Sequence, residues 1–531
     1  MPEKFLENIE PREYQQKIFE TCVNKNCLVV IPTGLGKTLI ALMLAVERMK
    51  KFPGKKVVFL APTKPLAEQH LQSFKRYLPE LFADMQLFTG QVNAEKRKKT
   101  WQTADIIFST PQCIANDLRK KMYDLNEVCL LIEDEAHRCL KNYDYNYIAQ
   151  QYKNQVEHQR ILGLTASPGS EVAKIIEICK NLSIEEVELR TRESEDVKKY
   201  LQVLEFEKKN VDFPAEFEEM RHVLSKLFNN YIEELRQRSV LFGPSSKTAL
   251  IILQKKIMGS LTRGNKNFNY MLGASACAQA IKIQHALELL ETQTLKSFNE
   301  YLKNLFDQAA KKQSRGVVKL VSKPEFNFVF MRSNELLSKK IEHPKLEELA
   351  KIIESEIVKN EKMKAIVFTQ FRDTASAISK KLNELKSINA KVFVGQAKKK
   401  GTGLSQKEQK SIINEFSAGD VNVLCATCIA EEGLDIPEVN VVIFYEPVPS
   451  AIRTIQRAGR TARVMNGKLI MLVTKKTRDE SFFYVSKNKE KRMHTAINSI
   501  KEGLLNSKGN LNIDEKKQEQ KTIKSYVKNS R

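Results

Sequence analysis

The sequence predicts an α/β protein in which two doubly wound, parallel-sheet domains stand in tandem with an all-helical domain inserted between them. Three observations support this prediction. Short, nearly all-apolar runs alternate with amphipathic helical patterns in the first third of the chain, the same alternation recurs in the last third, and the segment between them has helical periodicity alone. Strands that are buried on both faces of a parallel sheet have this almost continuous apolar composition.

The first α/β domain is expected over residues 1–200. Its predicted strands are 27–31, 56–61, 104–109, 128–134 and 160–165. Amphipathic segments such as 38–51 lie between these runs. Because strands that alternate with helices form a parallel sheet with helices on both faces, this region is predicted to be doubly wound.

The helical insert is expected over residues 201–340. Apolar side chains recur at spacings of three and four along 215–239, which predicts one helix face, and 274–312 is predicted to be a long helix or a helix pair. The insert contains 22 Lys and Arg against 14 Asp and Glu, a net charge of +8. It is therefore predicted to be a basic helical domain.

The second α/β domain is expected over residues 341–485. Its predicted strands are 365–371, 390–395, 421–426, 439–447 and 468–473. Residues 486–531 are polar and Lys-rich. Since such a segment cannot bury enough apolar surface to fold alone, it is expected to be a largely disordered tail.

Charge and composition narrow the functional class. Among 531 residues, 87 are Lys or Arg and 64 are Asp or Glu, and this net charge of +23 indicates a polyanionic partner such as nucleic acid. No apolar run has the ~18–20 residues that span a bilayer, and the N-terminus has no apolar signal core, so we expect an intracellular location, in the cytoplasm or nucleoid, away from membranes. Cys425 and Cys428 form a lone C-x-x-C in an apolar stretch, which favours a buried strand end over a zinc or redox site.

A phosphate-binding loop is predicted at residues 31–38, IPTGLGKT, between a strand and a helical pattern. Glycines permit a tight backbone turn, and the helix N-terminus adds its positive dipole end. Lys37 is expected to reach the β- and γ-phosphates of ATP, and Thr38 to bind Mg²⁺. Ile31 stands where the general pattern has its first Gly. The residues expected to hold the nucleotide are Thr33, Gly34, Leu35, Gly36, Lys37 and Thr38.

Two adjacent carboxylates follow the apolar run at 128–132, in the sequence IEDEAH. Asp134 is expected to hold Mg²⁺, and Glu135 to polarise the attacking water. Alone, these residues would suggest a solvated acidic turn. Their position in the chain after the phosphate loop favours metal-assisted hydrolysis of ATP.

Several motifs follow one another in the order found in superfamily 2 helicases, whose fold is a pair of tandem RecA-like domains. The motifs that carry this resemblance are PREYQQ (11–16), APTKPLAEQH (61–70), FTG (88–90), STPQ (109–112), TASP (165–168), VFTQFRDTA (367–375), FVGQ (393–396), ATCIAEEGLDIP (426–437) and QRAGRTAR (456–463). Within the superfamily, PTGLGKT, LSQKEQK (404–410) and FYEPVPSAIRTIQRAGRTAR (444–463) resemble the archaeal Hef helicases and the Fanconi anaemia group M translocases.

The resemblance implies roles for further residues. Arg12 and Gln15 would contact the adenine base, and Arg460 and Arg463 would act as arginine fingers on the γ-phosphate. Three more residues would line the nucleotide: Gln456, Gly433 and Asp435. Phosphates of a bound DNA strand would contact Lys64, Thr110, Gln396 and Thr427. The implied cofactors are ATP and Mg²⁺.

The resemblance implies an ATP-dependent helicase or translocase that acts on forked or branched DNA in replication-fork repair. The basic insert would contact the branch, although a structural spacer with solvated lysines is an open alternative. RIG-I-like receptors and Dicer share the general plan, so a double-stranded-RNA-dependent ATPase is the alternative function. Neither the RNA-binding domain of those receptors nor Dicer's nuclease domains are expected from this sequence, which favours DNA. A non-catalytic scaffold is disfavoured by the intact Lys37, Asp134 and Glu135.

The sequence departs from the family pattern in two places, and its tail contains one further motif. Ala462 replaces the second Gly of the arginine-bearing motif, which we expect to cost about 1 kcal/mol without loss of activity. The nuclease motif E-R-K-x-x-x-D is absent, so the chain is not expected to cut DNA by itself, and a separate nuclease is a candidate partner. Gln520, Ile523 and Tyr526 resemble a peptide that docks on sliding clamps, and a chance match is the alternative.

Overall fold

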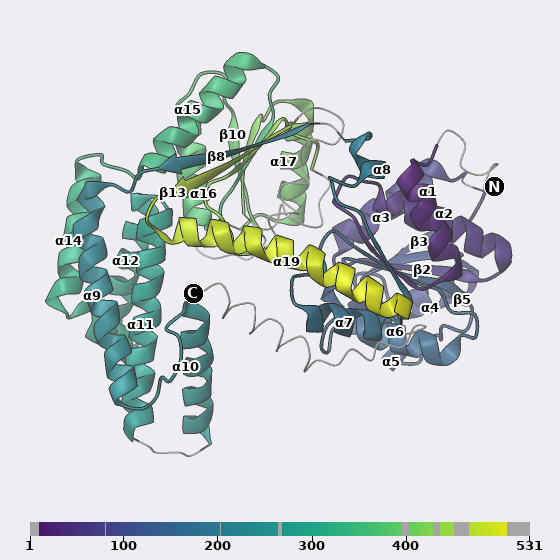
Figure 1. Ribbon diagram of the computed structural model, residues 1–531, viewed down its shortest axis with the longest axis horizontal. Coiled ribbons are helices and arrows are strands. Elements are labelled where there is room, and N and C mark those ends of the chain that lie inside the picture. Colours follow the sequence, from purple (N-terminus) through teal and green to yellow (C-terminus); the bar gives the residue numbers. More distant parts are fainter. Residues whose placement is uncertain are drawn as a thin grey trace.

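The structure is a computed structural model that describes residues 10–79, 81–201, 203–263, 268–395, 403–427, 436–450 and 467–506. Two α/β domains lie side by side, and a helical bundle stands next to the second one (Figure 1). The predicted architecture is therefore confirmed. Within the described ranges, no helix is long and apolar enough to cross a membrane.

The first domain contains a seven-stranded parallel sheet in the order β3-β4-β2-β5-β6-β1-β7. Its strands are β1 (Cys27–Val30), β2 (Lys56–Leu60), β3 (Met85–Phe88), β4 (Ile106–Ser109), β5 (Val128–Asp134), β6 (Ile161–Thr165) and β7 (Glu186–Leu189). The five predicted strands are all present. The sheet also has two edge strands, β3 and β7, that sequence analysis did not predict because each is short and partly polar.

Helices connect these strands and cover the sheet. They are α1 (Glu13–Asn24), α2 (Lys37–Lys51), α3 (Lys64–Tyr77), α4 (Ala94–Thr103), α5 (Pro111–Arg119), α6 (Asp144–Gln155), α7 (Val172–Asn181) and α8 (Glu195–Lys198). A short 3₁₀ helix, η1 (Ala136–Arg138), follows β5. Because every sheet connection in this domain is parallel, the carboxyl ends of all its strands meet at one edge, where ligands of open α/β sheets bind.

The second domain contains a six-stranded parallel sheet in the order β10-β11-β9-β12-β13-β8. Its strands are β8 (Leu204–Val211), β9 (Ala365–Phe368), β10 (Ala390–Phe393), β11 (Val423–Ala426), β12 (Val441–Phe444) and β13 (Gly467–Thr474), and its helices are α15 (Pro344–Lys359), α16 (Arg372–Leu382) and α17 (Gln406–Ala418). The five predicted strands are present. As predicted, Cys425 is a buried residue of β11.

One strand of this sheet corrects the predicted helical insert over 201–340. Strand β8 pairs with β13 along its whole length, from Leu204 opposite Gly467 to Val211 opposite Thr474. It lies at the edge of the sheet, and its sequence, LEFEKKNV, is only partly buried. An edge strand with one solvated face has no continuous apolar run, which is why its sequence resembled the polar insert.

The rest of the insert is helical, as predicted. Its helices are α9 (Ala215–Gln237), α10 (Lys247–Thr262), α11 (Phe268–Thr292), α12 (Leu295–Ala310), α13 (Arg315–Val321) and α14 (Pro324–Ser338). They share one apolar core, in which Phe217, Phe298 and Phe326 are fully buried. The bundle extends away from the second sheet as a separate lobe (Figure 1).

The prediction of a disordered tail from residue 486 is wrong as far as residue 506. Helix α19 (Arg478–Asn506) leaves the second domain and reaches the first, as the yellow helix in Figure 1 shows. Met493, Ile497 and Ile500 are buried in the core of the first domain. The lysines of this segment predict a solvated tail, but apolar residues among them recur at helical spacing and form one buried face. The clamp-like residues Gln520, Ile523 and Tyr526 lie outside the described residues.

A buried ion pair connects α19 with the bundle and the second domain. The side chains of Lys345, on α15, and Asp479, on α19, are completely buried and in contact. The Lys345 ammonium also donates to the carbonyl of Thr292, the last residue of α11, at 3.1 Å. The Asp479 carboxylate accepts from the amide of Thr474 at 3.0 Å. The pair therefore joins one helix of the bundle to the second sheet and to α19.

A buried titratable group also occurs in the central strand of the first sheet. Glu133, on β5, is completely buried, and its Oε2 accepts from Cys139 Sγ at 3.0 Å. Burial raises the pKa of Glu133 to about 8, an effect that the hydrogen bond from Cys139 only partly offsets. Its carboxyl group therefore keeps its proton at neutral pH, as a buried acid without a cationic partner should.

Replacement of one partner of the buried ion pair should destabilise the protein more than replacement of both. Lys345→Met leaves the Asp479 carboxylate buried without a cation and should lower the unfolding free energy by about 3–5 kcal/mol. Lys345→Met/Asp479→Leu should recover much of that loss. Urea unfolding followed by circular dichroism measures both. The control is Lys381→Met, which removes a partly exposed pair with Glu347 and should change stability little. Equal loss in the single and double variants would contradict this prediction.

The pKa of Glu133 predicts a pH dependence. Because its folded pKa of about 8 lies above the usual value of 4.5, the stabilising effect of its bound proton is complete below about pH 4.5 and is lost as the pH rises through about 8. Glu133→Gln cannot lose a proton. Its unfolding free energy relative to wild type should therefore rise between about pH 5 and pH 8 and then level off. The unfolding free energies of both proteins are measured by urea titration at several pH values. If they changed in parallel with pH, the raised pKa of Glu133 would be refuted.

Candidate functional site

The loop IPTGLGKT connects β1 to α2 at the carboxyl edge of the first sheet. Gly36 caps α2 in the left-handed conformation, with φ 76° and ψ 38°. A Cβ atom at Gly36 would lie 2.3 Å from Nε2 of Gln15, so only glycine fits here. The loop thus delivers the N-terminus of a 15-residue helix, where the helix dipole is positive, to the edge of the sheet.

Helix α1 holds this loop from behind. Tyr14 Oη and Gln15 Nε2 both donate to the carbonyl of Leu35, at 2.8 Å and 3.1 Å. The Gln15 side chain is buried, and its Oε1 accepts from the amide of Arg12 at 2.9 Å. The Arg12 guanidinium lies 5.2 Å from the centre of the Tyr200 ring. Of the two residues predicted to contact adenine, Gln15 therefore lies against the phosphate loop, and Arg12 lies beside Gln15 and Tyr200.

The predicted Mg²⁺ residues come together around His70, a residue that sequence analysis did not single out. Thr38 Oγ1 lies 3.4 Å from His70 Nδ1, and His70 Nε2 lies 2.9 Å from Asp134 Oδ2. Burial raises the pKa of Asp134, but the hydrogen bond with His70 and the charges of His70 and Lys37 outweigh burial, so the net pKa is below its usual value. Asp134 is therefore a buried carboxylate in its anionic form, next to the phosphate loop.

Glu135 stands in a strained turn directly after β5. Its φ of 52° and ψ of 46° are left-handed, a conformation that costs a residue other than glycine about 1–2 kcal/mol. Its Oε2 lies 3.2 Å from His137 Nδ1. Such strain is typical of functional sites, where the surrounding structure imposes it.

The donors at this site fit a nucleotide with its Mg²⁺. Thr33 Oγ1 is buried and makes no hydrogen bond within the described part of the chain, and the contact of the buried Glu135 Oε2 with His137 lacks hydrogen-bond geometry. Together with the Thr38 hydroxyl and the Asp134 carboxylate, they are hard oxygen donors beside a helix N-terminus. The described residues contain no cluster of three or more His, Cys, Asp or Glu that could cage a metal. Mg²⁺ suits this arrangement, since it usually takes one or two carboxylates and completes its shell with phosphates and water.

A chain of contacts links the turn at Glu135 to helix α19. His137 Nδ1 lies 3.2 Å from Thr165 Oγ1, in the TASP motif. Thr165 Oγ1 accepts from the amide of Ser167 at 3.1 Å, and the Ser167 hydroxyl donates to Met493 Sδ at 2.8 Å. The predicted nucleotide site is therefore connected by direct contacts to the helix that joins the two domains.

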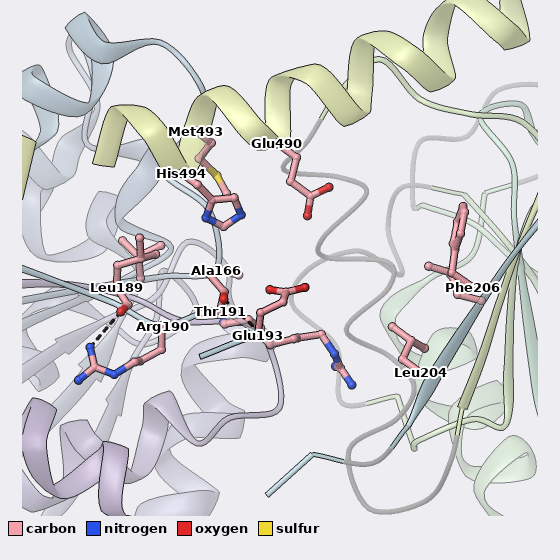
Figure 2. Close-up of a pocket in the computed structure, with 14 residues that line it drawn as sticks. Ala166, Leu189, Arg190, Thr191, Glu193, Leu204, Phe206, Glu490, Met493 and His494 are labelled. Carbon is pink, nitrogen blue, oxygen red and sulfur yellow. Dashed lines mark hydrogen bonds between the residues drawn. The ribbon is translucent and has the colours of Figure 1, made fainter. Parts of the chain in front are cut away.

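A cavity of about 360 Å³ lies between the domains, next to the phosphate loop. Figure 2 shows Glu490, Met493 and His494 of α19 on one side of it and Leu204 and Phe206 of β8 on another. The remaining lining residues are Val30, Pro32, Ala166, Leu189, Arg190, Thr191, Arg192, Glu193 and Leu469. Sequence analysis did not predict this cavity because its walls come from segments far apart in the chain.

The predicted strand-binding residues of the first domain lie at neighbouring strand ends. Lys64 begins α3 after β2, and Thr110 caps α5 after β4. Lys64 Nζ donates to Gln91 Oε1, in the loop after β3, at 2.7 Å. Since β3, β4 and β2 are adjacent in the sheet, these three segments form one edge. Thr427 follows β11 in the other sheet and is only 5% exposed.

Arg97 fastens two of these segments together. Its Nε and Nη2 donate to both carboxylate oxygens of Asp117, on α5, at 2.7 Å and 2.5 Å. Its Nη1 donates to the carbonyl of Thr89 at 3.2 Å and to that of Val92. Tyr123 Oη adds a third hydrogen bond to Asp117 at 3.0 Å. In the sequence, Arg97 stands among lysines on α4 and looks like one more solvated cation.

Six predicted site residues lie outside the described residues. They are Gln396, Gly433, Asp435, Gln456, Arg460 and Arg463. Cys428 and Ala462 also lie outside the described residues. The described site therefore comprises the first-domain half of the predicted nucleotide and strand contacts, together with Thr427.

Three known families match successive parts of the chain. Residues 12–175 match the DEAD/DEAH box helicases, and residues 344–465 match the helicase conserved C-terminal domain. Residues 216–343 match the family described as "Putative ATP-dependent RNA helicase, helical bundle". These matches cover the first domain, the bundle and the second domain in turn.

Curated relatives are similar over most of this chain. A protein of Methanocaldococcus jannaschii named "Putative ATP-dependent RNA helicase" is 37% identical over 93% of this chain and 61% of its own length. The Fanconi anemia group M protein homolog of Mus musculus is 30% identical over 94% of this chain and 26% of its own length. The chain thus spans less than two thirds of either relative.

A solved structure is similar over nearly its whole length. The crystal structure of the Pyrococcus furiosus Hef helicase domain is 41% identical, with a TM-score of 0.67, and the match covers 90% of this chain and 98% of that one. The chain belongs to the Hef and Fanconi anaemia group M family of superfamily 2 helicases.

Proposed function

We propose that this chain is an ATP-driven motor that translocates on forked or branched DNA during replication-fork repair. The observation that supports this proposal is that four segments meet at the carboxyl edge of the first sheet. They are the phosphate loop, α1, the end of β5 and α3, which contributes His70. Such a meeting of a helix N-terminus with an anionic carboxylate and a strained glutamate suits hydrolysis of a nucleoside triphosphate.

Each residue has a distinct part in the proposed reaction. Lys37 binds the β- and γ-phosphates, while Thr38 and Asp134 hold Mg²⁺, which would neutralise charge on the phosphate oxygens. Glu135 orients the attacking water, and its strained backbone fixes the direction of its carboxylate. Arg12 and Gln15 contact the base. Five residues of the second domain complete the site in this proposal: Gly433, Asp435, Gln456, Arg460 and Arg463.

Hydrolysis is proposed to require closure of the two domains. Arg460 and Arg463 stabilise the transferred phosphoryl group only when the second domain approaches, and an arginine finger contributes about 10³–10⁵ in rate. Since this contribution exists only in the closed state, turnover is tied to a domain movement. Repeated closure and opening would then shift the grip on the strand in steps.

The strand is proposed to be held through its phosphates. Lys64 and Thr110 on the first domain, with Gln396 and Thr427 on the second, are the proposed contacts. Phosphate contacts carry no sequence information, so binding should be independent of sequence and should weaken steeply with salt. Thr427 is mostly buried, and its backbone amide already donates to the carbonyl of Phe393 at 3.2 Å, so in this proposal the strand phosphate reaches its hydroxyl.

DNA is the proposed track, and RNA is the second candidate. The mouse and fungal relatives are named for Fanconi anaemia or as DNA helicases, whereas the archaeal relative and the helical-bundle family are named for RNA helicases.

Two protein partners are also proposed. They are a nuclease acting in trans and a sliding clamp bound through Gln520, Ile523 and Tyr526. If calorimetry detected no binding of the peptide 515–531 to a sliding clamp, the clamp would no longer be a proposed partner.

An ATPase assay with several nucleic acids tests this function. Single-stranded DNA, forked DNA, a four-way junction and double-stranded RNA are compared as activators, and branched DNA should stimulate most. Lys37→Ala should lower turnover at least about 10²-fold with every activator, since it removes a positioned charge from the transition state. Lys51→Ala, at the far end of the same helix, is the matched control and should retain activity. Strongest stimulation by double-stranded RNA would overturn the choice of DNA.

Arg97 should affect DNA binding more than ATP turnover. Arg97→Lys keeps the charge but loses the planar fork that holds Asp117 and two loop carbonyls at once. The half-saturating DNA concentration in the ATPase assay should rise about threefold to tenfold, and the rate at saturating DNA should change little. Arg119→Lys, which alters an exposed pair with Asp144, is the control. An unchanged half-saturating concentration in Arg97→Lys would show that the network does not position the strand contacts.

A further inference from the structure

Helix α3 buries one polar ring on the face that packs against the first sheet. The buried residues of this helix are Ala67, His70, Leu71 and Phe74, and their spacing of three and four defines that face. Packing alone would be served by an apolar side chain at each of these positions. His70 is only 6% exposed, and a buried imidazole is costly unless its nitrogens have hydrogen-bonding partners.

Both ring nitrogens of His70 face residues of the predicted nucleotide site. Nε2 lies 2.9 Å from Asp134 Oδ2, and Nδ1 lies 3.4 Å from Thr38 Oγ1. Because the Asp134 carboxylate is anionic, the hydrogen of the first contact is on Nε2 and His70 is the donor. In the tautomer with its hydrogen on Nε2, Nδ1 accepts from the Thr38 hydroxyl. The imidazole therefore stands between the two side chains that are proposed to hold Mg²⁺.

The imidazole ring is itself held in place. The ring centre of Phe59, on β2, lies 4.4 Å from that of His70, and the two ring planes are inclined by 32°. Phe59 is completely buried in the core of the first domain. A rotation of the imidazole would therefore disturb the packing on Phe59 as well as both polar contacts. The position of the ring is thus defined on its face by Phe59 and on its edge by Thr38 and Asp134.

The main chain and the side chain of Asp134 are held by different residues. Tyr145 Oη donates to the carbonyl of Asp134 at 2.6 Å and holds the end of β5. The hydrogen bond from His70 to Oδ2 restricts rotation of the carboxylate and thereby sets the direction of both its oxygens. Metal ligands are commonly oriented in this way by a neighbouring hydrogen-bonding group. Tyr145 therefore holds the strand end, and His70 orients the carboxylate.

We propose that His70 is a positioning residue for Mg²⁺, which orients the Asp134 carboxylate through Nε2 and the Thr38 hydroxyl through Nδ1. This inference rests on the proposed ATP hydrolysis and gives α3 a part in it. A hydroxyl that donates its hydrogen to Nδ1 keeps its lone pairs for a cation. Hydrogen-bonding partners of metal ligands commonly contribute about 10–100-fold to metal affinity.

Two substitutions separate the two hydrogen-bonding positions of the imidazole. In His70→Gln, the amide nitrogen takes the place of Nε2 and donates to Asp134. In His70→Asn, the shorter side chain takes the place of Nδ1 beside Thr38 but does not extend to Asp134. The matched control is Phe74→Leu, one turn further along α3. It removes a buried ring contact with Phe59 and leaves both polar contacts of His70 in place.

The test is a titration with Mg²⁺ of the full chain and a fluorescent, non-hydrolysable ATP analogue, which measures binding without turnover. The half-saturating Mg²⁺ concentration for analogue binding should rise about 10-fold or more in His70→Asn, because the Asp134 carboxylate loses its donor. It should stay within about threefold of wild type in His70→Gln and in Phe74→Leu. In excess EDTA, analogue affinity should be within about twofold of wild type in all variants, because the phosphate loop is unchanged.

The pattern across these variants decides the proposal. A shift in the Mg²⁺ dependence of His70→Asn alone supports it. An unchanged Mg²⁺ dependence in His70→Asn overturns it, and so does an equal shift in His70→Gln, because packing would then be responsible. Loss of analogue binding by His70→Asn in EDTA would show that His70 serves the fold and would also overturn it.

Wild type separates failure of this role from failure of the proposed function. If wild type bound the analogue with no dependence on Mg²⁺, the proposed metal-assisted hydrolysis would fail together with the role of His70. If wild type required Mg²⁺ and His70→Asn behaved like wild type, only the role of His70 would fail.

Discussion

The buried pair of Lys345 and Asp479 is the interaction on which the relation between the parts of this molecule depends. Each charge would be costly to bury alone, and each is stabilised only by the other and by main-chain groups around it. Those groups belong to α11 of the bundle and to the end of β13. The bundle, the second sheet and α19 therefore all meet at this ion pair, and a second pair between Arg478 and Glu291 also joins α19 to the bundle. A movement of the second domain is transmitted to the bundle and to the first turn of α19.

Helix α19 carries that fixed point across to the first domain. Its second half is buried there, with Ile497 and Ile500 in the core beneath the first sheet. Ser167, in the TASP motif, contacts Met493 on the same helix. The two domains are thus joined by α19 as well as by the chain between β7 and β8. Changes at the nucleotide site therefore have a direct mechanical route to the second domain and to the bundle, in addition to any contact across the cleft.

The central strands, the bundle and the phosphate site could be predicted from the sequence, because each has a local signal in composition, helical spacing or a contiguous motif. The sequence was insufficient where partners are distant in the chain. Strand β8 and helix α19 have polar sequences whose few apolar positions matter only against the second and first domains. His70 and Arg97 gain their importance from neighbours such as Asp134 and Asp117, 64 and 20 residues away. Neither spacing nor composition indicates those partners.

The central claim is that Asp134 and Glu135, beside the phosphate loop, hydrolyse ATP when the chain is bound to DNA. Glu135→Gln tests it most directly, because the substitution keeps the size of the side chain and removes only the carboxylate that orients water. Phosphate release on branched DNA and binding of a fluorescent ATP analogue are measured for both proteins. The variant should bind the analogue with an affinity within about threefold of wild type and release phosphate at least about 10²-fold more slowly. Phosphate release at the wild-type rate by Glu135→Gln would contradict the account.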